Sequence, residues 1–203
     1  MKLAVVGATG KAGSRIVKEA LDRGHEVTGI SRHPENALAH PRLKALKGDA
    51  EDPAALAGLL KGHDAVISSL RFVGTDAQKL IAAVKQSGVK RYLVVGGAGS
   101  LEVAPGKALF DTPGFPDVAK PESGKGREFL DAIRKEDGLD WSFLSPSTVF
   151  APGERSGKFR LGGDGLLTAA DGKSHISMED YAIALLDEVE TPRHIRRRFT
   201  VGY

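Results

Sequence analysis

A short apolar strand that leads directly into three glycines constrains this chain more than any other feature. Residues 3–6 are apolar, and Gly7, Gly10 and Gly13 precede a helical pattern over residues 14–21. Gly7 allows a sharp exit from the strand, Gly10 keeps side-chain bulk away from a ligand, and Gly13 allows close helix packing. Free N–H groups and the helix dipole favour a negatively charged group there.

This context predicts the pyrophosphate-binding turn of a dinucleotide site, although an ordinary strand-to-helix turn has the same glycines. The residues expected to contact the cofactor in the turn are Gly7, Thr9, Gly10, Lys11, Ala12 and Gly13.

Apolar runs and helical patterns alternate along most of the chain. Strands are expected at residues 2–6, 26–30, 43–46, 64–68, 91–95, 140–144 and 199–203, and helices at 11–23, 53–60, 75–86, 122–135 and 178–188. Such alternation predicts an α/β fold of the Rossmann type, a doubly wound and mostly parallel sheet with helices on both faces. The residues beyond Ser147 are expected to form a small C-terminal lid. No linker or repeat divides the chain, so residues 1–203 are expected to form a single NAD(P)-binding domain.

Composition excludes several classes of site. The 203 residues are 41% hydrophobic, which is enough for one sizeable core, and the absence of cysteine excludes disulfides, thiolate metal sites and a cysteine nucleophile. The histidines lack paired ligand spacing, so no metal is expected. No segment approaches the roughly 20 apolar residues of a membrane span, and we expect a soluble, cytoplasmic protein without membrane contact. The basic run at residues 193–198 is interpreted as a solvated turn rather than a nucleic-acid site.

The ends of the second and third expected strands carry the residues that would choose the cofactor, because ligands of doubly wound sheets bind at the carboxyl ends of strands. Arg32 stands where an NAD site usually has an acidic residue. With Ser31 and Lys11 it is expected to bind the 2′-phosphate of NADPH, the alternative being a solvated arginine. Asp49 either accepts a hydrogen bond from the adenine amino group or caps the next helix.

The later strand ends are expected to surround the rest of the cofactor and its reaction partner. Residues expected beside the adenosine and pyrophosphate are Ser69 and Leu70, those beside a planar ring are Gly97 and Ala98, and those beside the nicotinamide amide are Pro146, Ser147 and Thr148. Ser100 is a candidate catalytic donor to a substrate carbonyl or flavin oxygen, or else a turn residue. His175 is a second catalytic candidate, for a proton or a flavin phosphate, although the sequence favours a surface or core-edge histidine over this role. The proline-rich loop at residues 105–121 is expected beside this site.

Four segments together resemble the atypical short-chain dehydrogenase/reductases. They are residues 7–13, residues 94–101, residues 140–147 (DWSFLSPS) and residues 176–182 (ISMEDYA). The chain is most similar to the small NAD(P)H-binding proteins of the NADH-flavin reductase type, a set that includes biliverdin reductase B-like flavin reductases. The resemblance covers almost the whole chain, and it implies an NADPH site and reduction of a flat aromatic acceptor such as FMN or FAD.

One departure from the wider superfamily bears on mechanism. The usual Tyr-x-x-x-Lys pair is absent, because Pro121 stands four residues before Lys125. Reduction of an ordinary ketone needs an aimed proton donor, whereas reduced flavin can take its proton from solvent. We therefore expect an NADPH-dependent reductase of a flavin or similar small aromatic acceptor, acting as a monomer or homodimer. The alternatives are a non-catalytic NADP(H) sensor, or a quinone-reducing or epimerase-like relative.

Overall fold

A computed structural model describes residues 1–203, and its centre is an eight-stranded sheet. In spatial order the strands are β10 (Arg160–Gly162), β12 (Arg197–Gly202), β8 (Asp140–Pro146), β5 (Arg91–Val95), β4 (Ala65–Ser68), β1 (Lys2–Val6), β2 (Glu26–Ser31) and β3 (Leu43–Lys47). All neighbours are parallel except the edge pair of β10 and β12. The chain moves outward from β1 in both directions, which confirms the predicted doubly wound α/β fold.

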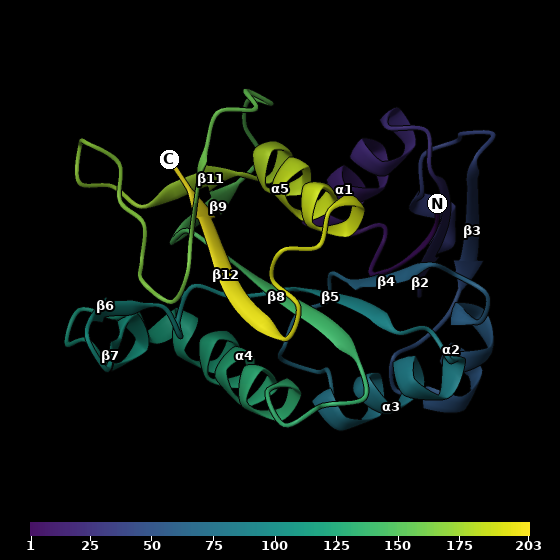
Figure 1. The fold of residues 1–203 in the computed structure, drawn as a ribbon, viewed down its shortest axis with the longest axis horizontal. Coiled ribbons are helices and arrows are strands. Elements are labelled where there is room, and N and C mark those ends of the chain that lie inside the picture. The colour runs from purple at the N-terminus through teal and green to yellow at the C-terminus, as the bar shows by residue number, and fades with distance from the viewer.

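Helices cover both faces of the sheet (Figure 1). One face carries α1 (Lys11–Asp22) and α5 (Met178–Glu190), and the other carries α2 (Pro53–Leu60), α3 (Ala77–Ser87) and α4 (Lys120–Ile133). Successive side chains of a strand point to opposite faces, so Leu3 and Val5 enter the α1–α5 core whereas Ala4 and Val6 enter the other. This two-sided burial explains the continuous apolar runs of the strands. Trp141 and Phe143 are core residues, as their place in the sequence predicts.

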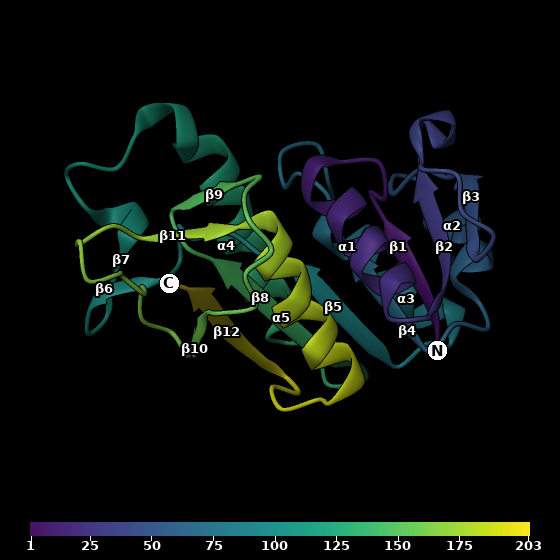
Figure 2. The same cartoon turned by 90° about the horizontal axis from the view of Figure 1, so that it is seen from above.

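The expectation of a C-terminal lid needs correction. Helix α5 lies beside α1 over the sheet, and β12 lies inside the sheet between β8 and β10 (Figure 2). Tyr181 and Phe199 are completely buried, which explains why these elements join the core instead of covering it. The segments outside the main sheet are the short pairs β6 (Glu102–Ala104) with β7 (Lys107–Ala108), and β9 (Val149–Ala151) with β11 (His175–Ser177).

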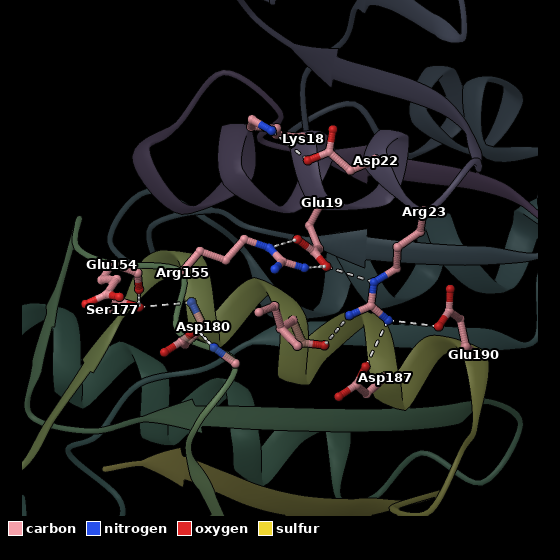
Figure 3. Close-up of polar contacts among 12 residues, drawn as sticks. Lys18, Glu19, Asp22, Arg23, Glu154, Arg155, Ser177, Asp180, Asp187 and Glu190 are labelled. Atoms are coloured by element: carbon pink, nitrogen blue, oxygen red, sulfur yellow. Dashed lines mark hydrogen bonds and ion pairs between the residues drawn. The ribbon is translucent and has the colours of Figure 1, made fainter.

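Ion pairs fasten α1 to α5 and to the loop after β9 (Figure 3). The carboxylate of the buried Glu19 accepts two hydrogen bonds from Arg155, at 2.8 and 2.9 Å, and one from Arg23 at 2.9 Å. Arg23 also contacts Asp187 and Glu190 of α5. Burial alone would raise the pKa of Glu19, but the bonds from the two arginines outweigh it and lower that pKa.

The start of α5 is anchored in the same region. Ser177 is the N-cap and accepts from the Asp180 backbone N–H, while the Asp180 carboxylate accepts from Ser156 Oγ, from the Gly157 N–H and from the Tyr203 hydroxyl. Asp180 therefore anchors the loop and the chain end onto the helix. No helix is both long and apolar enough to cross a membrane.

Candidate active site

Two adjoining cavities, of about 440 and 550 Å³, form a groove over the carboxyl ends of the central strands. They share Gly10, Ser69, Leu70 and Arg71, so one ligand can pass between them. The groove lies where β1 is flanked by β2 and β4, the point at which the sheet's strand order reverses. We call the smaller cavity the polar half and the larger one the apolar half.

The glycine turn forms the floor between the two halves. Gly7 has φ +86°, and a Cβ there would lie 2.2 Å from the Ser69 carbonyl oxygen. A Cβ at Gly13 would lie 2.1 Å from the Gly7 carbonyl oxygen, so only glycine lets α1 approach the strand this closely. Gly13 lines neither half, in keeping with a packing role.

The start of α1 opens into the groove. Its N-cap, Gly10, has no side chain to satisfy the first helical N–H groups, and the first turn holds no acidic residue. Lys11 and Ala12 line the apolar half, and Thr9 lines the polar half. Uncapped N–H groups beside a bare glycine suit a pyrophosphate.

The polar half brings together three of the four residues predicted to choose the cofactor, whereas Lys11 lines the apolar half. Ser31, Arg32 and Asp49 all line the polar half. The Ser31 hydroxyl is buried and has no hydrogen-bond partner in the protein, which is the condition of a group awaiting a ligand. Arg32 is exposed at the rim, and no carboxylate neutralises it among the ion pairs of the chain.

The alternative role of Asp49 as a helix cap is wrong. The N-cap of α2 is Asp52, whose carboxylate accepts from the Ala55 N–H at 3.1 Å. Asp49 instead accepts from the Glu51 N–H at 3.0 Å in a local turn and faces the groove. A hydrogen-bond acceptor therefore remains in the polar half, and its contact with an adenine amino group stays a prediction.

The apolar half has a bare strip of backbone along one side. Residues 96–99, including Gly97 and Ala98, line it next to β5, and Pro146, Ser147 and Thr148 line it at the end of β8. The Ser147 hydroxyl donates to the Val201 carbonyl and the Thr148 hydroxyl donates to the Ser174 carbonyl. Both hydroxyl protons are thus held within the protein, and what these residues offer a nicotinamide is lone pairs and backbone groups.

The opposite wall comes from residues that the sequence did not identify individually. They are Phe72 after β4, Leu109, Thr112, Phe115 and Pro116 of the proline-rich loop, Ala119, Glu122 and Ser123 at the start of α4, and Phe150 on β9. The prediction that the loop at residues 105–121 lies beside the site is confirmed. The four prolines and the aromatic residues of that loop were the available signal, but their side-chain directions depend on α4.

Glu122 fixes the aromatic part of this wall. Its carboxylate accepts from the backbone N–H groups of Phe72 at 2.7 Å and Val73 at 2.9 Å. The Phe72 ring packs against Phe129, with ring centroids 5.5 Å apart, and stacks on Phe143 at 6.2 Å. The apolar half therefore has an aromatic side that Glu122 holds in place. Both oxygens of the Glu122 carboxylate already accept hydrogen bonds from backbone N–H groups.

The two catalytic candidates of the sequence analysis lie elsewhere. Ser100 follows the glycine strip but does not line the groove, because its carbonyl and hydroxyl accept from Arg198. His175 lies on β11 with its ring packed against Tyr203, at 4.9 Å between centroids, and its Nδ1 is buried without a partner. The structure brings neither side chain to the groove.

No tyrosine faces the groove either. The Tyr92 and Ser68 hydroxyls bond to each other, Tyr181 donates to the Leu144 carbonyl, and Tyr203 donates to Asp180. Burial raises the pKa of Tyr92 and Tyr181 well above the ordinary value. No other tyrosine therefore takes the place of the tyrosine of the absent Tyr-x-x-x-Lys pair at this site.

Comparison with known proteins agrees with this geometry. The model of a family described as NAD(P)H-binding matches residues 7–192. An uncharacterized protein of Bacillus subtilis, YwnB, is 40% identical over 99% of this chain and 98% of its own. A crystal structure from Bacteroides thetaiotaomicron, named as a putative epimerase, is 42% identical, covers 100% and 96% of the two chains, and has a TM-score of 0.95. Another, from Streptococcus pneumoniae and named as a putative NADH-flavin reductase, is 39% identical, covers 100% and 99%, and has a TM-score of 0.88. The chain thus belongs to the NAD(P)H-binding family, and its sheet has the Rossmann fold.

Proposed function

We propose that this protein is an NADPH-dependent reductase that delivers hydride to a flavin or a similar planar aromatic acceptor. The observation that carries the proposal is the division of one groove into a polar half, which has phosphate-binding features, and an apolar half with aromatic walls. Nicotinamide, when bound, supplies the hydride. The protein's part is to hold two flat groups against each other and to exclude water between them.

Cofactor binding is assigned residue by residue. The start of α1 binds the pyrophosphate through its N–H groups, and the Gly7–Gly10 turn leaves room for it. Arg32 and the unpartnered Ser31 hydroxyl bind the 2′-phosphate, which selects NADPH over NADH. Asp49 accepts from the adenine.

Acceptor chemistry follows from what surrounds the apolar half. Reduction of a simple ketone produces an alkoxide that a side chain has to protonate. No tyrosine or histidine lines the apolar half to do so, and reduction of simple ketones is therefore disfavoured. A flavin ring takes its proton from water after hydride arrives. The structural relative named as a putative NADH-flavin reductase supports this choice of acceptor.

The test is anaerobic NADPH oxidation with added FMN, followed at the nicotinamide absorbance band. The matched control is Gly10→Val, in which a branched side chain fills the phosphate approach. We expect oxidation that depends on the wild-type protein and is absent with the variant. Binding of NADPH without oxidation would contradict the reductase proposal and favour an NADP(H) sensor.

A further inference from the structure

Two hydroxyl groups that line the apolar half of the groove form no hydrogen bond within the protein, those of Ser69 and Ser123, and Ser69 also lines the polar half. Two hydroxyl side chains, those of Thr112 and Ser123, lie on the side of the apolar half that the proline-rich loop and α4 form. Thr112 donates to the Leu109 carbonyl at 2.7 Å, so its proton is committed. Ser123 Oγ takes part in no hydrogen bond within the protein, although helical serines often bond back to a carbonyl of the preceding turn.

Ser123 is held against the backbone strip on which a planar ring would lie. It stands in the first turns of α4, directly opposite Gly99. A Cβ at Gly99 would lie 2.7 Å from Ser123 Cβ and 3.0 Å from Ser123 Oγ, so glycine at that position is what admits the serine. The hydroxyl therefore lies beside the Gly99 end of the strip.

The surroundings of Ser123 favour one kind of partner. Its neighbour Glu122 is engaged with two backbone N–H groups, and the cavity that Ser123 lines also has Phe72, Leu109 and Phe115 in its walls. The wall that carries Phe115 is braced, because Phe115 packs on Phe110 and Arg127 lies 4.9 Å over the Phe110 ring. Arg127 is itself paired with Asp111 at 2.8 Å. An apolar pocket with a free hydroxyl on its α4 side suits an uncharged ring with a carbonyl at its edge.

We infer that Ser123 donates a hydrogen bond to a ring carbonyl of the acceptor and thereby selects planar carbonyl-bearing rings, of the quinone or isoalloxazine kind. This inference rests on the proposed reductase function and identifies its substrate class. In the reaction, NADPH loses a hydride to become NADP⁺, the acceptor ring gains that hydride with its two electrons, and solvent supplies one proton. The Ser123 bond strengthens as negative charge develops on the carbonyl oxygen, and the serine itself keeps its proton at the end of the cycle.

The test compares wild type with Ser123→Ala, and with Thr191→Ala as a control hydroxyl loss at the exposed end of α5. The acceptors are menadione and riboflavin, which have ring carbonyls, and methylene blue, which has none. We expect Ser123→Ala to lower kcat/KM for both carbonyl acceptors by about fivefold to tenfold, the effect of one hydrogen bond, and to leave methylene blue reduction unchanged. An equal loss with all three acceptors, or no loss, would overturn the inference.

A binding measurement separates this inference from the proposed function. Riboflavin is titrated into NADP⁺-saturated protein and its fluorescence quenching gives a Kd that does not depend on turnover. We expect Ser123→Ala to raise this Kd about fivefold and Thr191→Ala to leave it unchanged. If wild type fails to oxidise NADPH but still shows this difference, the reductase proposal fails and the Ser123 contact stands. If wild type does not bind riboflavin, or binds it as the variant does, the Ser123 contact is refuted.

Discussion

Replacing Arg32 by alanine should convert a cofactor preference into near-indifference between NADPH and NADH. Arg32 directly follows β2 and lines the polar half. Its side chain is exposed, and no carboxylate pairs with it. Its guanidinium is thus available to a phosphate without first breaking an ion pair. A hydrogen bond to a charged group contributes about 1.5 to 3 kcal/mol, and the exposed position of Arg32 favours the lower part of that range.

A loss of about 1.5 to 2 kcal/mol corresponds to a Kd for NADPH that is about 10- to 30-fold higher. NADH has no 2′-phosphate, so its Kd should change little. The assay is calorimetric titration of both cofactors into wild type, Arg32→Ala and Lys44→Ala. Lys44 is an exposed cation on β3 that lies outside the groove, so its variant makes the same change in net charge.

The reasoning predicts that the NADPH-to-NADH preference falls in Arg32→Ala alone and that added salt weakens NADPH binding to wild type more than to that variant. Two results would refute it. An unchanged preference would mean that Arg32 does not meet the phosphate. An equal loss in Lys44→Ala would mean that the overall charge of the protein, and not a contact, determines the preference.

Two further predictions concern packing and charge. Gly13→Ala places a Cβ 2.1 Å from the Gly7 carbonyl oxygen, so we expect Tm to fall by roughly 6 to 12 °C with NADPH binding lost. Gly58→Ala, in an open position of α2, should leave Tm unchanged or raise it, and equal effects would contradict the steric argument. Glu19 has a lowered pKa, so its contacts stabilise the fold above about pH 4.5, the ordinary value, and this stabilisation is lost as pH falls through the lowered pKa. Urea unfolding should show that Glu19→Gln loses less stability than wild type between neutral pH and about pH 3, and parallel losses would disprove this role of Glu19.

Much of the groove follows from local sequence. The polar half is made of residues that lie at or directly after strand ends, such as Ser31, Arg32 and Asp49, and the positions of strand ends can be read from apolar runs. All but one of the predicted cofactor-binding residues line the groove, and the exception, Gly13, lies beneath it.

The two predicted catalytic residues lie outside the groove for a common physical reason. Ser100 directly follows the glycine strip, but the direction of its side chain depends on Arg198, which is 98 residues away along the chain. His175 was expected at the cofactor mouth, but β11 pairs with β9 and turns the ring toward Tyr203. In both cases the deciding contact is made by β12 or the chain end that follows it, whose insertion into the sheet leaves no local signal.

The sequence by itself therefore determined the order of strands and helices, the glycine turn and the end of the sheet at which a dinucleotide would bind. These features depend on side-chain periodicity and on the φ angles that glycine permits, which are properties of a few adjacent residues. Only the tertiary structure decided which side chains line the apolar half of the groove. Phe72, Phe115, Ser123 and Phe150 lie on four separate segments, and they line one cavity because α4 and β9 pack where they do.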